Sequence, residues 1–213
     1  MNMLRLFLMI LMLAAVQGKA HAQSRGVEPS LAFETLSPKA GSIVRIALVM
    51  DAKPGWHAYW TNPGEVGAPP RIEWKVPGDF IFSDLRHPAP KILDVQGIAS
   101  FVHEGSFALL TTMRVPSGLT AGEPIPLTAK VSWLACSSTQ CVPESRTLEK
   151  VLVVGEGETD YPGLSRIRQA EARIPDRTVN GTFTYEDGRF ILSIPRVSGR
   201  SPTVFPSEQG WLE

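Results

Sequence analysis

The two cysteines of the chain lie close together, and their chemistry is the easiest to specify. Cys136 and Cys141 are separated by four small or polar residues, Ser137-Ser138-Thr139-Gln140. One strand-like segment runs into Cys136 and another follows Cys141, so the spacing predicts a hairpin with both sulfurs within bonding distance across its mouth. A disulfide at this place would be either a structural staple or a redox-active pair.

The short loop between the cysteines makes them a weak staple. Closing so few residues contributes about 2 kcal/mol, against about 3 kcal/mol for a 15-residue loop, so a stabilising bond would gain more by joining distant strands. No Lys, Arg or His lies between the cysteines, and no helix N-terminus is predicted beside them. A nearby positive charge or a helix N-terminus is the usual means of lowering a thiol pKa, and neither is visible beside these cysteines. If the pair exchanges disulfides, we expect the partner protein to bring the more activated thiolate.

Two further segments could serve such a site. Trp56-His57-Ala58-Tyr59-Trp60, followed by Asn62-Pro63-Gly64, could cover a reactive sulfur, form a docking surface, or fill the core from a strand edge that ends in a turn. The segment 97–105 reads as a flexible loop between strands. Its Phe101 could act as a lid or as a buried anchor.

Few residues of the chain could support metal binding, hydrolysis or nucleic-acid binding. The histidines His57, His87 and His103 are widely spaced, only Met50 and Met113 lie outside the leader, and no zinc-type cysteine pairs are present. The hydrolase motifs G-x-S-x-G and H-E-x-x-H and the phosphate loop do not occur. The balanced charge, with no dense Lys/Arg run, argues against nucleic-acid binding. We expect no metal and no cofactor.

The elements that must position the cysteines read as short strands. Glycine and proline supply 18 residues each of the 213, which argues against a helical bundle. Strand-like alternation is found in four places: Val44 to Met50, 107–115, 127–134 and 145–154, the last with Leu148, Val151 and Val153 as expected core residues. Strands punctuated by turns predict an all-β antiparallel sandwich over about residues 28–155.

The rest of the chain changes character. Residues 156–178 read as a connector with one short helix over 163–173, closed by Pro175. Two strand candidates then flank Asp187-Gly188, a strong hairpin signal. We predict that residues 179–213 are an incomplete second β domain, with a hairpin packed on the first domain as the alternative.

The N-terminus reads as an export signal. Arg5 precedes the apolar run 6–16, which is too short to span a membrane, and small residues surround Ala22. Residues 1–22 are predicted to be a signal peptide cleaved after Ala22. The mature chain would have 191 residues, 19 basic against 21 acidic, a net charge of −2 and no membrane span. In an oxidising compartment two nearby cysteines usually pair.

Taken together, the aromatic Asn-Pro-Gly segment, the 101–105 segment and Trp133-Leu134-x-Cys136…Cys141-x-Pro143 resemble the N-terminal periplasmic domain of the thiol:disulfide interchange protein DsbD family. The resemblance covers roughly residues 30–155 and is nearest to the branch typified by the suppressor of copper sensitivity protein B. It implies an immunoglobulin-like sandwich in the periplasm with a redox-active cysteine pair.

The resemblance also implies roles and partners. Electrons would come from a membrane-embedded conveyor through its thioredoxin-like domain and pass to periplasmic disulfide isomerases or related thioredoxin-like substrates. Cys141 matches the exchanging cysteine and Cys136 the resolving one. Phe101 matches an aromatic cap that shields the pair, and Tyr59 matches a tyrosine beside the cysteines. His57 replaces a second tyrosine, a departure from the family pattern.

Two other functions remain open from the residues alone. One is a non-catalytic immunoglobulin-like binding module whose disulfide is structural. The other is a periplasmic copper-handling domain that uses Cys136, Cys141 and a histidine.

Overall fold

The computed structural model describes residues 26–95, 97–175, 180–194 and 203–208. The predicted signal peptide, residues 1–22, lies outside them. The elements, in chain order, are β1 (Val27–Phe33), β2 (Ile43–Ala52), β3 (His57–Gly64), β4 (Arg71–Lys75), β5 (Ile81–Phe82), β6 (Lys91–Val95), β7 (Ile98–Glu104), β8 (Ser106–Arg114), β9 (Pro124–Cys136), β10 (Cys141–Val153), α2 (Tyr161–Glu171), β11 (Thr182–Glu186) and β12 (Arg189–Ser193).

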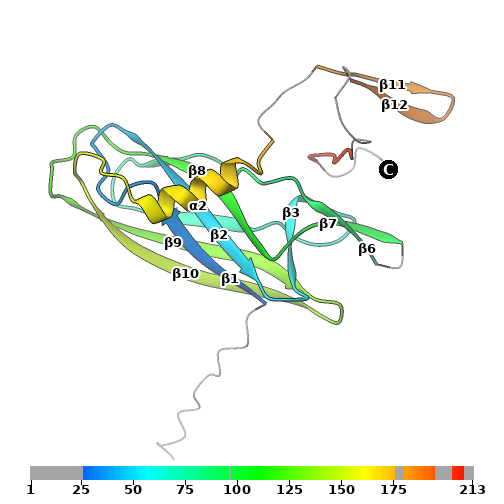
Figure 1. Ribbon diagram of the computed structural model, residues 1–213, viewed down its shortest axis with the longest axis horizontal. Helices are drawn as coiled ribbons and strands as arrows, with labels where there is room; N and C mark the ends of the chain where they lie inside the picture. Colours follow the sequence, from blue (N-terminus) through cyan, green and yellow to red (C-terminus); the bar gives the residue numbers. More distant parts are fainter. Residues whose placement is uncertain (1–25, 96, 176–179, 195–202, 209–213) are drawn as a thin grey trace, which may run out of the picture.

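Two antiparallel sheets pack face to face (Figure 1). The four-stranded sheet has the order β1-β2-β8-β5, and the larger sheet has the order β10-β9-β3-β7-β6, with β4 also paired to β9. The predicted all-β sandwich is therefore confirmed. The core lies between the sheets, where Leu48 and Leu109 of the smaller sheet pack with Val131 and Trp133 of the larger one.

Alternation along the strands explains most of this core. Val44, Ile46, Leu48 and Met50 of β2 are all buried, as their period of two predicts. On β10 the prediction is confirmed for Leu148, which packs against the core, and wrong for Val151 and Val153, which are exposed, while Leu152 is fully buried. The run Val151-Leu152-Val153-Val154 is apolar at every position, so only the pairing with β9, Leu152 opposite Ile125, decides which face is inside.

The helix α2 covers the outer face of the four-stranded sheet (Figure 1). It begins where the side chain of Asp160 accepts a hydrogen bond from the Gly163 backbone N–H, 3.2 Å away, with Pro162 in the first turn. Ile167 and Ala170 lie on its buried side and pack on Ala47 and Val49 of β2. The predicted short helix is therefore present, shifted by two residues.

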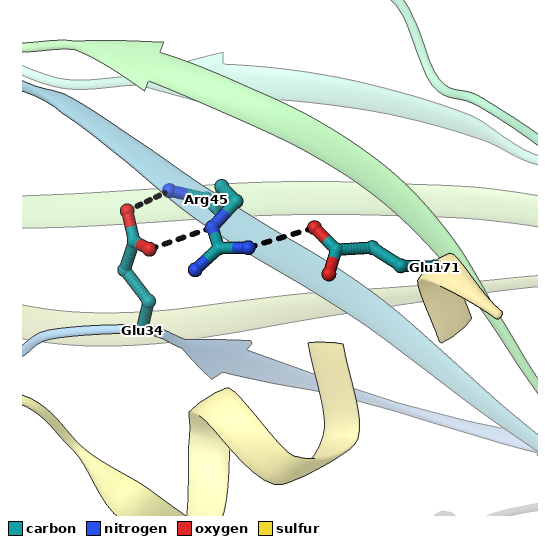
Figure 2. A network of polar contacts seen from close by, with 3 residues as sticks. All are labelled: Glu34, Arg45 and Glu171. Carbon is teal, nitrogen blue, oxygen red and sulfur yellow. Dashed lines mark hydrogen bonds and ion pairs between the residues drawn. The ribbon is translucent and has the colours of Figure 1, made fainter. Parts of the chain in front are cut away.

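A polar network ties the same helix to the sheet. The Arg45 guanidinium of β2 lies between two carboxylates, donating from Nε to Glu34 at 2.7 Å and from Nη1 to Glu171 of α2 at 2.8 Å (Figure 2). The hydrogen bond to Glu34, opposed by partial burial and reinforced by Glu171, raises the pKa of Arg45. The connector helix is thus held to the sandwich by apolar packing and by ion pairs.

The hairpin β11–β12 forms a separate two-stranded sheet. Its turn is Asp187-Gly188, and both residues have positive φ, 50° and 74°, as a two-residue type I′ hairpin turn requires. Every residue of both strands is exposed. The hairpin predicted from Asp-Gly is confirmed, and Figure 1 shows it standing clear of the sandwich.

Among the described residues, none of the helices has the length and apolar character needed to traverse a bilayer.

Candidate functional site at the end of the β9–β10 hairpin

A disulfide joins Cys136 to Cys141. Cys136 is the last residue of β9, Cys141 is the first of β10, and the two are directly opposite in the antiparallel register. The backbone N–H of Ser137 donates to the Gln140 carbonyl at 2.8 Å and closes the loop between the strands. The predicted hairpin with sulfurs bonded across its mouth is confirmed.

The two sulfurs have different surroundings. Cys136 is 1% exposed, whereas Cys141 is an exposed residue. Ala135, next to Cys136, faces the sandwich core, so alternation turns Cys136 to the outer face of the larger sheet. There it packs in a small cluster with Tyr59 of β3 and Val102 of β7, and with the partly buried Leu93 and Leu134.

Tyr59 makes a polar contact within this cluster. Its hydroxyl donates a hydrogen bond to Cys136 Sγ at 3.1 Å, and the side chain is 3% exposed. Burial raises the pKa of Tyr59, so the phenol keeps its proton at neutral pH and remains a donor. A donor aimed at this sulfur would stabilise it as a thiolate when the disulfide is cleaved.

The chain crosses the ring of Tyr59 at Gly67, which has φ of 120°. A Cβ added at Gly67 would lie 2.3 Å from Cδ1 and from Cε1 of Tyr59. Because a phenol ring is stiff and already buried, no larger residue fits here without displacing it. Gly67 thus fixes where the Tyr59 hydroxyl points.

His57 lies opposite Cys136 in the pairing of β3 with β9. Its ring meets the ring of Tyr59 edge to face, with centroids 5.5 Å apart. Burial lowers the pKa of His57, and the charge of Glu104, its partner across β7, opposes that shift only in part. The imidazole is therefore neutral at pH 7 and supplies no cation to the sulfurs.

The segment 97–105 is not the loop predicted from sequence. Residues Ile98–Glu104 form strand β7, paired on one side with β3 and on the other with β6. Gly97 and Gly105 lie in the turns at its two ends, and these breakers suggested a loop although the strand between them is regular. Its side chains therefore have fixed directions.

Alternation along β7 puts Phe101 and Val102 on opposite faces. Val102 packs on Cys136, whereas the ring of Phe101 contacts Trp60 at 6.2 Å and Phe205 at 5.4 Å between centroids. Among the described residues, the apolar side chains in the Cys136 cluster do not include Phe101. The structure thus brings together Cys136, Cys141, Tyr59 and His57, and places Phe101 elsewhere.

Leu93 is the covering residue that sequence reasoning missed. It lies on β6, opposite Ser100, on the face of the β6–β7 hairpin that carries Val102. The one available signal is the short segment Lys91-Ile92-Leu93-Asp94-Val95 just before Gly97, which is rich in apolar residues but does not alternate and so does not by itself predict a strand.

In the part of the chain that the structure describes, no group of three or more His, Cys, Asp or Glu side chains could hold a metal ion.

The chain is similar to known proteins in sequence and in fold. Residues 23–153 match the family model of the thiol:disulfide interchange protein DsbD, N-terminal. The N-terminal periplasmic domain of ScsB from Proteus mirabilis has the same fold, with a TM-score of 0.61 at 22% identity over 82% of this chain. The match covers 66% of that structure, so the chain spans just under two thirds of its length.

Two structures from Neisseria meningitidis are more distant. The complex between the DsbD N-terminal and the PilB N-terminal domains matches with a TM-score of 0.33 at 13% identity, over 67% of this chain and 94% of that one. The reduced DsbD N-terminal domain matches with a TM-score of 0.27 at 16% identity, over 63% and 88%. No curated protein sequence is significantly similar to the chain.

Proposed function

We propose that this chain, which belongs to the family of N-terminal domains of the thiol:disulfide interchange protein DsbD, exchanges disulfides with other proteins through Cys136 and Cys141. The family membership and the disulfide support thiol–disulfide interchange as the general activity. The direction of electron flow and the role of each cysteine are the finer parts of the proposal.

The observation that carries the proposal is the unequal exposure of the two sulfurs. An attacking thiolate must approach a disulfide sulfur directly, so the exposed Cys141 is the accessible target and Cys136, 1% exposed, is not. The sulfur that then leaves is Cys136, which receives the hydrogen bond from Tyr59. A bond that only stapled the hairpin would need neither an open sulfur nor a donor aimed at its partner.

The exchange runs in two steps in the reducing direction. The thiolate of Cys141 attacks a substrate disulfide, forms a mixed disulfide and releases one substrate sulfur as a thiolate, which takes up a proton. Cys136 then loses its proton and attacks Cys141 Sγ, which breaks the mixed disulfide and releases the second substrate sulfur. The substrate has gained two electrons and two protons, and the Cys136–Cys141 disulfide has formed.

We assign the partners by the same chemistry. The donor is a dithiol protein that reduces the pair by the reverse steps, in our proposal the thioredoxin-like domain of a membrane electron conveyor. The acceptor is a periplasmic disulfide isomerase or a related thioredoxin-like protein. These assignments place the mature chain in the periplasm after removal of residues 1–22.

Trapping tests the cysteine roles. In the Cys136→Ser variant the mixed disulfide on Cys141 cannot be resolved, so we expect covalent complexes to accumulate in periplasmic extract and to disappear on reduction. The matched control is Cys141→Ser, whose remaining cysteine is buried and should trap far less. Equal trapping by both variants, or none by either, would contradict the assignment of Cys141.

The reduction potential separates exchange from a purely structural bond. Structural disulfides in exported proteins have potentials below about −300 mV, whereas exchanging pairs lie higher. We expect a value above that limit when the intact chain is equilibrated with glutathione buffers. A value well below it would favour the binding module with a structural disulfide.

A further inference from the structure

A segment from the C-terminal part of the chain is docked on the sandwich. Residues 203–208 lie against β3 and β7, and Figure 1 shows the segment in red near the ends of these strands. Phe205 meets the ring of Trp60 at 6.0 Å and the ring of Phe101 at 5.4 Å, and these two rings meet each other at 6.2 Å. All three contacts are edge to face, the arrangement that aromatic rings prefer.

Asn62 holds the backbone of the same segment. Its side-chain amide nitrogen donates to the carbonyls of Pro206 and Glu208, at 2.9 Å each, while its oxygen accepts from the Gly64 backbone N–H at 2.9 Å. Asn62 is 3% exposed, so both hydrogens of the amide are used in a buried place. The segment is therefore held in two ways: the ring of Phe205 packs on two other rings, and two backbone carbonyls accept from one amide.

The docked segment lies behind the disulfide site. Trp60 and Phe101 share a strand face with Ala58 and His103, which turn toward the inside of the sandwich. Tyr59 and Val102, the intervening residues of the same two strands, point the other way and pack on Cys136. The two strands therefore contact the segment with one face and the buried sulfur with the other.

This part of the sheet is joined to β9 at one point. The register of β3 with β9 contains the single pair His57 and Cys136, whereas β9 and β10 pair along their full length. Beyond that pair, the positions of Tyr59, Val102 and Leu93 depend in part on the groups that pack on the other face of β3, β7 and β6. Phe205, packed on Trp60 and Phe101, and the hydrogen bonds of Asn62 are among these groups.

We propose that residues 203–208 are an intramolecular clasp that keeps Cys136 covered. When the clasp is docked, β3 and β7 hold Tyr59 and Val102 against the sulfur. When it leaves, the β3–β7–β6 edge loosens and Cys136 becomes accessible to reagents. The chain beyond the connector would thereby control the chemistry of a disulfide in the preceding domain. The inference goes beyond the exchange reaction, because it concerns only the accessibility of this sulfur.

Alkylation of Cys136 tests the clasp. In the full chain carrying Cys141→Ser, Cys136 is the only thiol, and its rate of reaction with iodoacetamide reports how often the cover opens. We expect Phe205→Ala to raise this rate about tenfold, which corresponds to about 1.4 kcal/mol in the opening free energy. The matched control is Phe183→Ala on β11, an exposed ring that packs only within its own hairpin among the described contacts, and it should leave the rate unchanged.

A second variant tests the hydrogen bonds from Asn62 to the backbone of residues 203–208. Asn62→Asp keeps an oxygen for the Gly64 N–H but loses the donor to the two carbonyls, so it should raise the alkylation rate in the same direction. Hydrogen exchange should rise at the same time in residues 91–104, which form β6 and β7. If Phe205→Ala and Asn62→Asp both match Phe183→Ala in rate and in exchange, the clasp is refuted. Trapping by Cys136→Ser is a separate measurement, so this failure would leave the exchange proposal standing.

Discussion

The two faces of β3 and β7 bury polar groups in opposite ways. On the outer face the Tyr59 hydroxyl has a partner, Cys136 Sγ, at 3.1 Å. On the inner face His103 stacks on His87, with ring centroids 5.9 Å apart. Buried nitrogens of these two rings, Nε2 of His103 and Nδ1 of His87, have no hydrogen-bond partner among the described residues.

The outer face thus holds a hydroxyl that can stabilise a thiolate, whereas the inner face holds imidazoles that are stable only in the neutral form. A buried donor with a partner is stabilising and can favour one form of that partner, here the Cys136 thiolate. A buried imidazole without partners is acceptable only while it is neutral. Burial, reinforced for His103 by the charge of His87, lowers the pKa of His103 to about 3, and burial lowers that of His87 to about 4.

The largest expected effect is on stability and comes from protonating His87 and His103 at low pH. In the unfolded chain both histidines take up a proton near pH 6.5. In the folded chain His87 takes up its proton only near pH 4 and His103 only near pH 3. Stability is therefore full above pH 6.5 and falls as the pH decreases toward those values. Between pH 7 and 5 we expect a loss of about 3 kcal/mol in the free energy of unfolding, measured by urea titration.

His103→Phe provides the control, because a phenyl ring preserves the stacking on Phe107, where the centroids are 4.6 Å apart. The variant should remove roughly half of the contribution of the inner face to the pH dependence, since one of its two histidines is gone, while His57, whose pKa burial also lowers, stays in place. An unchanged slope between pH 7 and 5 would show that the inner face is not what responds to acid.

On the outer face, Tyr59→Phe removes the hydroxyl and keeps the ring. In a Cys141→Ser background we expect the pKa of the Cys136 thiol to rise by about one unit, because a hydrogen bond to a charged group contributes about 1.5 kcal/mol or more. The thiolate absorbance in the ultraviolet, followed against pH, measures it. If the two titration curves coincide, the hydroxyl does not stabilise the thiolate.

Leu93→Ala should have a smaller effect on the same face. It removes part of the cover over Cys136 from β6 and leaves the hydrogen bond of Tyr59 in place. We expect the alkylation rate of Cys136 to rise by about threefold, since Leu93 is only partly buried and its loss leaves an open site rather than a closed cavity. Ile81→Ala, at an exposed position on β5 of the other sheet, is the control and should change nothing.

The smallest effect is expected for His57→Gln. The pKa of His57 is lowered by burial, so the ring carries no charge at pH 7 that could assist a thiolate. The rate of disulfide reduction by dithiothreitol should change less than about twofold, as for a neutral replacement of similar size. A much larger drop at pH 7 would mean that the imidazolium participates after all.

The features that the sequence predicts correctly are those that depend on residues close together in the chain. The cysteine hairpin follows from two strands and a four-residue loop, and β11–β12 follows from Asp187-Gly188, whose turn type needs those residues. The period of two along β2 identified Val44, Ile46, Leu48 and Met50 as core residues. It did not identify Ala47 and Val49 on the opposite face, which are buried because α2 packs on them.

What could not be read depends on contacts between distant segments. Leu93 reaches Cys136 only because β6 pairs with β7 and β7 with β3, a register that no single segment contains. Phe101 was expected at the cysteines, but its direction is fixed by the pleat of β7, and its partner Phe205 lies more than a hundred residues along the chain. Val151 and Val153 were assigned to the wrong face for the same reason, since pairing with β9 selects the buried side of an all-apolar run.

The contact between Gly67 and Tyr59 has a consequence for how the site can evolve. Because any side chain at position 67 would collide with the ring, a change there is tolerated only if the ring changes as well. Across related sequences these two positions should therefore vary together: where position 67 carries a side chain, a residue smaller than tyrosine should occupy position 59. Such covariation would mark lineages in which the sulfur has lost its donor.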